Sequence, residues 1–272
     1  MTKTITVIER KNALQFINLG ELWRYRELLF TFVQRDFKLK YRQTVLGILW
    51  AILQPLTTMV VFSFFFGKLA KMPSDGVPYP IFSFSGLLLW TYFSNSLSNA
   101  SNSMVGNAHL ITKVYFPRVI VPIASTLYGL IDYAISMIIM VGLIIYYQIP
   151  LSPKLLLLPL VIFFTVLLSN GLGFILASIN VKFRDVRYIL PFFLQLLLYV
   201  TPVIYPASVA ERFKIILYLN PMTGLIETHR AIWLMLPIPW MSLFFSIFLS
   251  LILLFIGAFY FRQTERQFAD II

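Results

Sequence analysis

Long uncharged, apolar windows alternate along this chain with short clusters of charged residues. A helix needs about 20 mostly apolar residues to cross the hydrocarbon core of a membrane. Six windows between successive charged residues reach that length. We therefore predict one transmembrane domain over residues 1–272, without a 20–50-residue repeat. Its spans are expected at about 43–67, 81–102, 119–147, 155–179, 188–204 and 239–261.

The second predicted span is the least apolar of the six. After Phe93 its sequence turns to serine and asparagine, through to Ser103. Small and amide side chains suit close packing between helices better than contact with lipid. We expect the second half of this span to face protein.

Composition supports a membrane protein. Hydrophobic residues make up 59% of the 272 residues and charged residues only 12%, about half the usual share. These values exclude soluble, disordered and coiled-coil classes. Because the chain has no cysteine, disulfides are excluded as well.

The distribution of positive charge predicts the orientation. Six spans place both termini on one side, and the segments on that side carry 16 of the 22 Lys and Arg residues. The opposite segments carry the other 6. By the positive-inside rule both termini are expected in the cytoplasm. The first twenty residues lack the apolar run of a signal peptide.

Residues 20–42 are predicted to form an amphipathic helix on the membrane surface. Polar residues recur there every three or four positions, while most of the remaining circumference is apolar. Asp36 interrupts the apolar face and needs a partner such as Arg35 or Lys40. The helix can be a plain lipid anchor or a docking ledge for a cytoplasmic partner. The polar positions are Arg24, Glu27, Thr31, Arg35, Lys38 and Arg42.

Two features lie inside the spans. The first span holds Gln54-Pro55, where a helix is expected to kink, and the aromatic run Phe62–Phe66, which suits either lipid contact or the wall of a sugar pathway. Asp132 is the one formal charge deep in a span. It can serve an ion relay, or it can be a structural acid that pairs with a basic residue elsewhere.

The segment 205–238 is predicted to form short re-entrant helices outside the last span. Its apolar runs are too short to cross and are punctuated by proline. Glu227 and Arg230 are helical neighbours that can pair. Such a segment suits the rim of a pathway.

Motifs for nucleotide or metal chemistry are missing. The only Gly-Lys, at Gly67-Lys68, has Phe62 where a phosphate-binding loop needs its first glycine. His109 and His229 fall on opposite sides of the predicted membrane. We expect no catalytic residue, no metal and no cofactor in this chain, and no nucleic-acid partner. If it pumps, another subunit supplies the energy.

Three stretches carry a resemblance to a known family. They are Leu22-Trp23-Arg24-Tyr25-Arg26-Glu27-Leu28-Leu29 with Arg35–Gly47, Trp50 and Leu53-Gln54-Pro55; Val114-Tyr115-Phe116-Pro117-Arg118; and Leu219–Glu227 with Arg230. Together they resemble the polysaccharide-export class of ABC transporter permeases, which exports O-antigen, capsule and teichoic-acid chains. With the six-span layout the resemblance covers nearly the whole chain.

The resemblance implies a homodimer with two copies of an ATP-binding subunit, which would hold the ATP and magnesium. The substrate would be a lipid-linked polysaccharide, and lipids of the cytoplasmic (inner) membrane of a bacterium would surround the complex. The resemblance also implies site residues at the matching positions of this sequence. The interface and lipid gate would involve Arg35, Asp36, Lys38, Tyr41 and Arg42, and contact with the ATPase would involve His109, Lys113 and Arg118. The channel wall would include Trp50, Phe62, Phe65, Phe66 and Tyr199, and the external gate would include Tyr205, Asn220, Pro221, Glu227 and Arg230.

Two other functions fit the sequence. An ion-coupled secondary transporter would depend on Asp132 and not on ATP. A membrane enzyme that transfers glycan from a lipid carrier would need an acid at the membrane face, for which Asp75, Glu211 and Glu227 are candidates.

Overall fold

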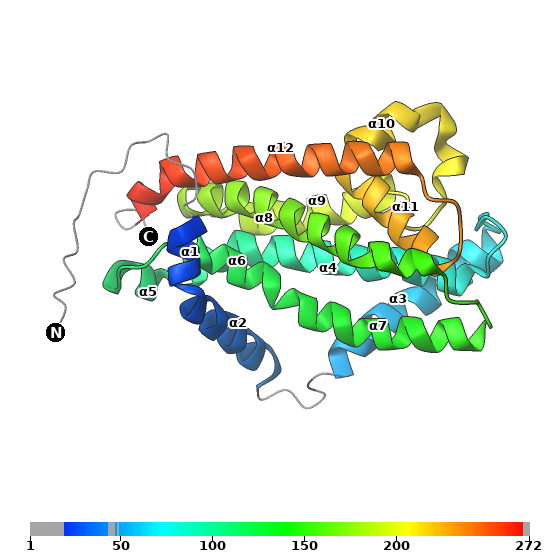
Figure 1. Ribbon diagram of the computed structural model, residues 1–272, viewed down its shortest axis with the longest axis horizontal. Helices are drawn as coiled ribbons and strands as arrows, with labels where there is room; N and C mark the ends of the chain where they lie inside the picture. The colour runs from blue at the N-terminus through cyan, green and yellow to red at the C-terminus, as the bar shows by residue number, and fades with distance from the viewer. Residues whose placement is uncertain (1–18, 43–46, 48, 269–272) are drawn as a thin grey trace.

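The computed structural model describes residues 19–42, 47 and 49–268, and the regular elements within them are helices (Figure 1). A π-helix at Ser63–Leu69 extends α3, and 3-10 turns lie at Pro153–Leu157, Ala207–Phe213 and Glu265–Gln267. The α-helices are α1 (Leu19–Arg24), α2 (Arg26–Tyr41), α3 (Leu49–Phe62), α4 (Tyr79–Gly106), α5 (Ala108–Lys113), α6 (Ile120–Leu127), α7 (Gly129–Tyr146), α8 (Leu158–Lys182), α9 (Val186–Val200), α10 (Lys214–Leu219), α11 (Pro221–Trp233) and α12 (Trp240–Thr264).

Within the described residues, four helical stretches are long and apolar enough to cross a membrane. They are Leu49–Leu69, Ile120–Tyr146, Pro153–Lys182 and Trp240–Thr264. The all-helical architecture of an integral membrane protein is thereby confirmed. The other two predicted spans coincide with α4, which is long but less apolar, and with α9, which has 15 residues. Six crossings and the orientation of the termini stay predictions.

Helix α4 lies at the centre of the bundle. It packs against α3, α6, α7, α8, α9 and α11, and most of its side chains are buried. Serines that a soluble helix would show to water are enclosed here, including Ser83, Ser85, Ser96 and Ser101. Small side chains allow neighbouring helices to approach closely. Within the polar stretch that the sequence assigns to protein contact, Ser96, Ser101 and Ser103 are buried, whereas Asn102 is exposed.

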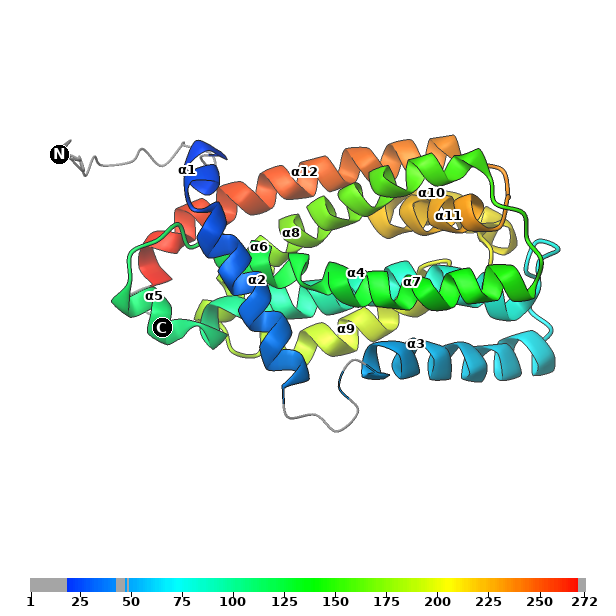
Figure 2. The same cartoon turned by 60° about the horizontal axis from the view of Figure 1, so that its bottom comes forward.

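The bundle has two distinct ends, which we call the terminal end and the far end. At the terminal end α1 and α5 lie close to the C-terminal end of α12, and α2 crosses the bundle obliquely (Figures 1 and 2). A separate apolar cluster there includes Phe32, Ile111, Phe116 and Phe261. At the far end α10, α11 and the loops that follow α3 and α7 come together.

Several boundaries differ from the sequence-based ones. The amphipathic helix is divided at Tyr25 into α1 and α2. Helix α9 ends at Val200, and not at 204, because Thr201 precedes Pro202 and adopts an extended backbone. The first span continues to Leu69 through the π-helix, while its predicted opening at 43–46 and the N-terminal residues 1–18 lie outside the described residues.

Candidate functional site

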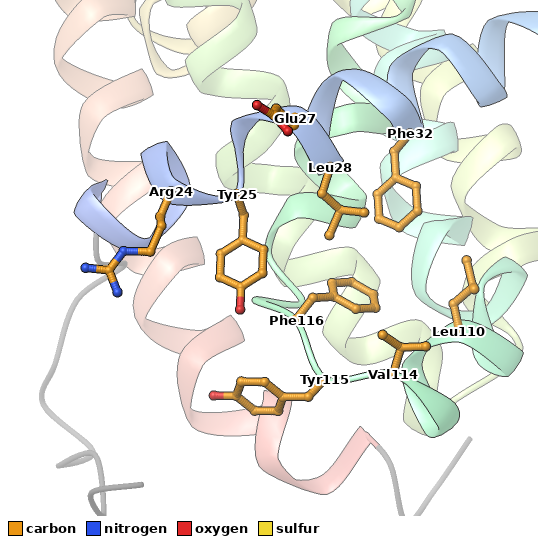
Figure 3. A pocket seen from close by; sticks show the side chains of 9 residues that line it. All are labelled: Arg24, Tyr25, Glu27, Leu28, Phe32, Leu110, Val114, Tyr115 and Phe116. Carbon is orange, nitrogen blue, oxygen red and sulfur yellow. The ribbon is translucent and has the colours of Figure 1, made fainter. Parts of the chain in front are cut away.

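A groove of about 420 Å³ opens at the terminal end between the α1–α2 segment and the loop after α5 (Figure 3). Leu28 and Phe32 project from α2 toward Phe116, and Val114 and Tyr115 form the other wall. Tyr115 is 82% exposed. An open groove with apolar walls at the end of a bundle is a suitable surface for a protein partner.

Aromatic packing holds α2 in place beside this groove. The rings of Phe32 and Phe116 meet edge to face with centroids 5.7 Å apart. The guanidinium of Arg35 lies 4.6 Å from the Phe32 ring centroid and donates from Nη2 to Asp36 Oδ1 at 2.7 Å. Asp36 therefore finds its partner in Arg35, one of the two candidates from the sequence.

The remaining predicted interface residues divide into two kinds. Lys38 and Arg42 are exposed. Tyr41 turns toward the bundle and its hydroxyl donates to Asp132. Burial, and then the hydrogen bond to Asp132, raise the pKa of Tyr41 above its ordinary value, so the hydroxyl keeps its proton.

Asp132 forms an ion pair with Lys40, from the same end of α2. Only 17% of the Asp132 side chain is exposed, so its charge is screened mainly by Lys40 and by the Tyr41 hydroxyl. This is the structural arrangement that the sequence left open, an acid paired with a distant basic residue. Lys40 and Tyr41 lie about 90 positions away along the chain, so local spacing could not identify them.

The predicted coupling residues lie on and after α5. His109 and Lys113 are exposed at the terminal end. Arg118 is instead half-buried, and its Nη1 donates to the backbone carbonyl of Glu265. His109 and Lys113 are therefore accessible to a partner, while Arg118 ties the loop to the end of α12.

At the far end Asn220 and Pro221 begin α11. The Asn220 side-chain oxygen accepts from the Met222 backbone N–H at 3.0 Å, and its amide donates to Thr201 Oγ1 at 2.8 Å. This is an N-cap followed by proline at the first helical position. Tyr205, also predicted at this gate, donates to the Val200 carbonyl at 2.8 Å.

Arg230 is a buried cation, only 3% exposed. Its Nη2 donates to the carbonyls of Pro202 and Val203 at 3.1 and 2.8 Å, and its guanidinium lies 3.8 Å from the Phe82 ring centroid. A Cβ at Gly86 would lie 2.6 Å from Nη2, so glycine is needed there. Arg230 thus fixes the chain just after α9 against α4 and α11.

A pocket of about 300 Å³ lies beside Arg230 and is also lined by Asp75 and Glu227. Asp75 Oδ1 accepts from Ser208 Oγ at 3.1 Å, and Glu227 Oε2 accepts from Ser242 Oγ at 2.9 Å. No cluster of three potential metal-ligating side chains occurs within residues 19–42 and 49–268. The side chain of Glu211, the third acid considered for glycan transfer, lies outside the description.

The sequence did not reveal a buried hydrogen-bond network around His229. The Tyr133 hydroxyl lies 2.8 Å from His229 Nε2, the Trp233 indole N–H donates to the same nitrogen at 3.2 Å, and His229 Nδ1 lies 2.8 Å from the Ser85 carbonyl. An indole can only donate and a carbonyl can only accept. His229 is therefore neutral, with its proton on Nδ1. A histidine four residues before a tryptophan was the available signal.

Helices α3 and α9 expose aromatic faces. Trp50, Phe65 and Tyr199 are about half exposed, whereas Phe62 and Phe66 are half-buried against the core. Two amide side chains, Gln54 on α3 and Gln195 on α9, also lie on the exposed faces. By contrast, the exposed positions of α12 between Trp240 and Ile256 are all apolar.

Comparison with known proteins decides the family. The profile of the ABC-2 type transporter family matches residues 27–234, most of the chain. The chain belongs to this family. It is 32% identical over 256 residues to the O-antigen export system permease protein RfbA of Myxococcus xanthus, covering 92% of this chain and 97% of that protein.

Relatives of lower identity also carry the names of O-antigen export and polysialic acid transport proteins. An RfbA of Klebsiella pneumoniae is 26% identical over 94% of this chain and 97% of its own length. The polysialic acid transport protein KpsM of Escherichia coli is 24% identical over 85% of this chain and 91% of its own length. The resemblance to polysaccharide-export ABC permeases is confirmed, and the chain is a transport permease like its relatives.

Proposed function

We propose that this ABC-2 permease forms the channel of an ATP-driven exporter that moves a lipid-linked polysaccharide across the bacterial cytoplasmic membrane. It would act as a homodimer with two copies of a separate ATP-binding subunit. The names of the relatives support the substrate class, and the family supports the ATP-binding partner.

The observation that carries the channel assignment is the pair of amides on α3 and α9. Gln54 and Gln195 lie near the middle of their helices, are exposed, and make no hydrogen bond through their amides to the described residues. An unsatisfied amide in hydrocarbon costs several kcal/mol. These faces therefore suit a hydrated path or a second protomer better than lipid. Their aromatic neighbours would contact the C–H faces of passing sugars.

The terminal end supports the other half of the proposal. The groove between α2 and residues 114–116, with His109 and Lys113 exposed beside it, offers apolar and basic contacts to a soluble subunit. We propose that the ATP-binding subunit docks here and moves α2, with Arg35, Lys38 and Arg42 beside the lipid-linked substrate.

The test is export of the native glycan after a charge is placed on each face. Phe65→Arg on the π-helix and Tyr199→Arg on α9 should each block export while the complex with the ATP-binding subunit still assembles. Phe244→Arg is the matched control, because Phe244 is also a far-end phenylalanine that is mostly exposed, but on the apolar face of α12. Because position 244 lies near the start of α12, the long side chain of an arginine there can place its charge at the membrane surface.

Normal export by both Phe65→Arg and Tyr199→Arg would refute the channel wall. Loss of export in Phe244→Arg alone would place the path along α12 instead.

A further inference from the structure

One turn of α7 bonds to three other helices, α2, α3 and α11, to which the proposed function assigns different tasks. Asp132 pairs with Lys40 and accepts from Tyr41 of α2. Tyr133, the next residue, bonds to His229 of α11 at 2.8 Å. Ser136 Oγ donates to the Ala51 carbonyl of α3 at 3.0 Å. We call residues 132–136 the α7 node.

We propose that the α7 node links the surface helix α2 to α3 and to the far-end helix α11, and that this linkage couples movement of α2 to transport. In this arrangement a displacement of α2 by the ATP-binding subunit would reach the channel helix and the far end through one rigid turn. Asp132, Tyr133 and Ser136 act as positioning residues in this linkage. The inference rests on the proposed function for what is transported, but not for the linkage itself.

The bond from the node to α11 is directional and well enclosed. Tyr133 is 4% exposed and His229 is fully buried, so their hydrogen bond has little competition from water. Because Nδ1 of His229 carries the proton, Nε2 is left as an acceptor and the Tyr133 hydroxyl must donate. Phenylalanine at 133 would remove this bond and keep the ring.

The node lies between a close contact with α4 and a small cavity beside α3. Helices α6 and α7 meet at Tyr128, whose backbone is helical, so the two form one continuous stretch just before the node. A Cβ at Gly129 would lie 2.9 Å from Ser96 Oγ, so the start of α7 lies close against α4. On the other side a cavity of about 60 Å³, lined by Gln54, Asp132 and Ser136, lies between α7 and α3 beside the Ser136–Ala51 bond. That volume holds about two waters.

The first test follows α11 without any substrate. The full chain in lipid nanodiscs is studied by hydrogen exchange mass spectrometry, with Lys40→Met as the perturbation at α2. We expect the amides of α11 to exchange about threefold faster, the change that matches one interhelical hydrogen bond in a membrane. In a Tyr133→Phe background α11 should already exchange faster, and Lys40→Met should add nothing.

Arg26→Met is the matched control, because it removes one positive charge from the same helix at its exposed start, where Arg26 bonds locally to the Trp23 carbonyl. It should leave α11 unchanged. An unchanged α11 in Lys40→Met, or equal effects of Lys40→Met with and without Tyr133→Phe, would overturn the linkage.

The second test uses the complex with its ATP-binding subunit and measures glycan exported per ATP hydrolysed. Tyr133→Phe should lower this ratio about threefold at an unchanged ATPase rate. Tyr146→Phe removes the same atom from an exposed tyrosine of α7 and should leave the ratio unchanged. A merely structural role for Tyr133 would lower protein yield and ATPase rate together, and leave the ratio as it is.

A double variant shows whether Asp132 and Tyr133 act through one linkage or independently. Asp132→Asn with Tyr133→Phe should lower the export ratio no further than the worse single variant, because both break the same connection. Effects that multiply would overturn the proposal. If the parent complex exports no glycan but Lys40→Met still loosens α11 through Tyr133, the proposed substrate fails and the linkage stands.

Discussion

Helices α4 and α12 are nearly equal in length and opposite in environment. Helix α4 has 28 residues, many of them serine or asparagine, and most of its side chains are buried. Helix α12 has 25 residues, is among the four apolar stretches, and exposes a continuous aromatic and aliphatic face. The more polar helix is therefore the one inside. In a membrane protein, apolarity marks contact with lipid and not depth in the fold.

The two helices are also attached in different ways. Helix α12 meets α8 backbone to backbone, since a Cβ at Gly257 would lie 2.0 Å from the Gly171 carbonyl oxygen. Helix α4 meets α8 partly through polar side chains, with Asn180 Nδ2 donating to the Ser101 carbonyl at 2.9 Å and to Asn102 Oδ1 at 3.2 Å. We therefore expect a larger side chain at the backbone contact between α8 and α12 to destabilise the protein far more than removal of a hydrogen-bonding side chain between α4 and α8.

The largest expected effect is that of Gly257→Leu. Both partners at the contact are backbone, so α8 and α12 must separate, and overpacking of this kind costs about 1–3 kcal/mol or more. We expect little monodisperse protein in detergent size-exclusion chromatography. Gly142→Leu on α7, where a Cβ meets nothing within 4 Å, should elute like the parent. A normal profile for Gly257→Leu would show that the crossing is looser than described.

A smaller effect is expected for Asn180→Ala. The variant loses the two bonds to α4, and hydrogen bonds between membrane helices are worth about 0.6–1.7 kcal/mol. The melting temperature, followed by tryptophan fluorescence in nanodiscs, should fall by a few degrees. Gln263→Ala removes an exposed amide near the end of α12 and should melt with the parent. Equal melting of the two variants would mean that α4 is held by packing alone.

The smallest effect is expected for Ser101→Ala. The Ser101 hydroxyl is buried and makes no hydrogen bond to the described residues, so its removal relieves a desolvation cost. The melting temperature should be unchanged or slightly higher. Ser246→Ala is the contrast, because Ser246 Oγ accepts from the Gly224 N–H at 3.0 Å and its loss should cost about 1 kcal/mol. Destabilisation by Ser101→Ala would reveal a partner for that hydroxyl.

Windows of hydropathy and charge predicted the place of each long helix, because each crossing needs its own apolar length. The short helices predicted between prolines over 205–238 correspond to α10 and α11, which meet at Asn220-Pro221. The end of α9 was missed because the effect of Pro202 on Thr201 outweighs an apolar stretch that continues past it.

Contacts across long sequence separations were out of reach. Nothing near Asp132 indicates Lys40, and nothing near Tyr133 indicates His229, 96 positions later. The sequence identified Asp132 as unusual for its charge, whereas neutral Tyr133 and His229 gave no such signal. Which apolar faces meet lipid also depends on the packing, so only the structure separates the amide-bearing faces of α3 and α9 from the face of α12.

The central claim is that this permease is the channel subunit of an ATP-driven exporter. It is tested most directly by gentle purification from native membranes followed by mass measurement of the intact complex. We predict two copies of this chain with two copies of an ATP-binding subunit. A chain that purifies without any ATP-binding subunit and transports without ATP would contradict the claim.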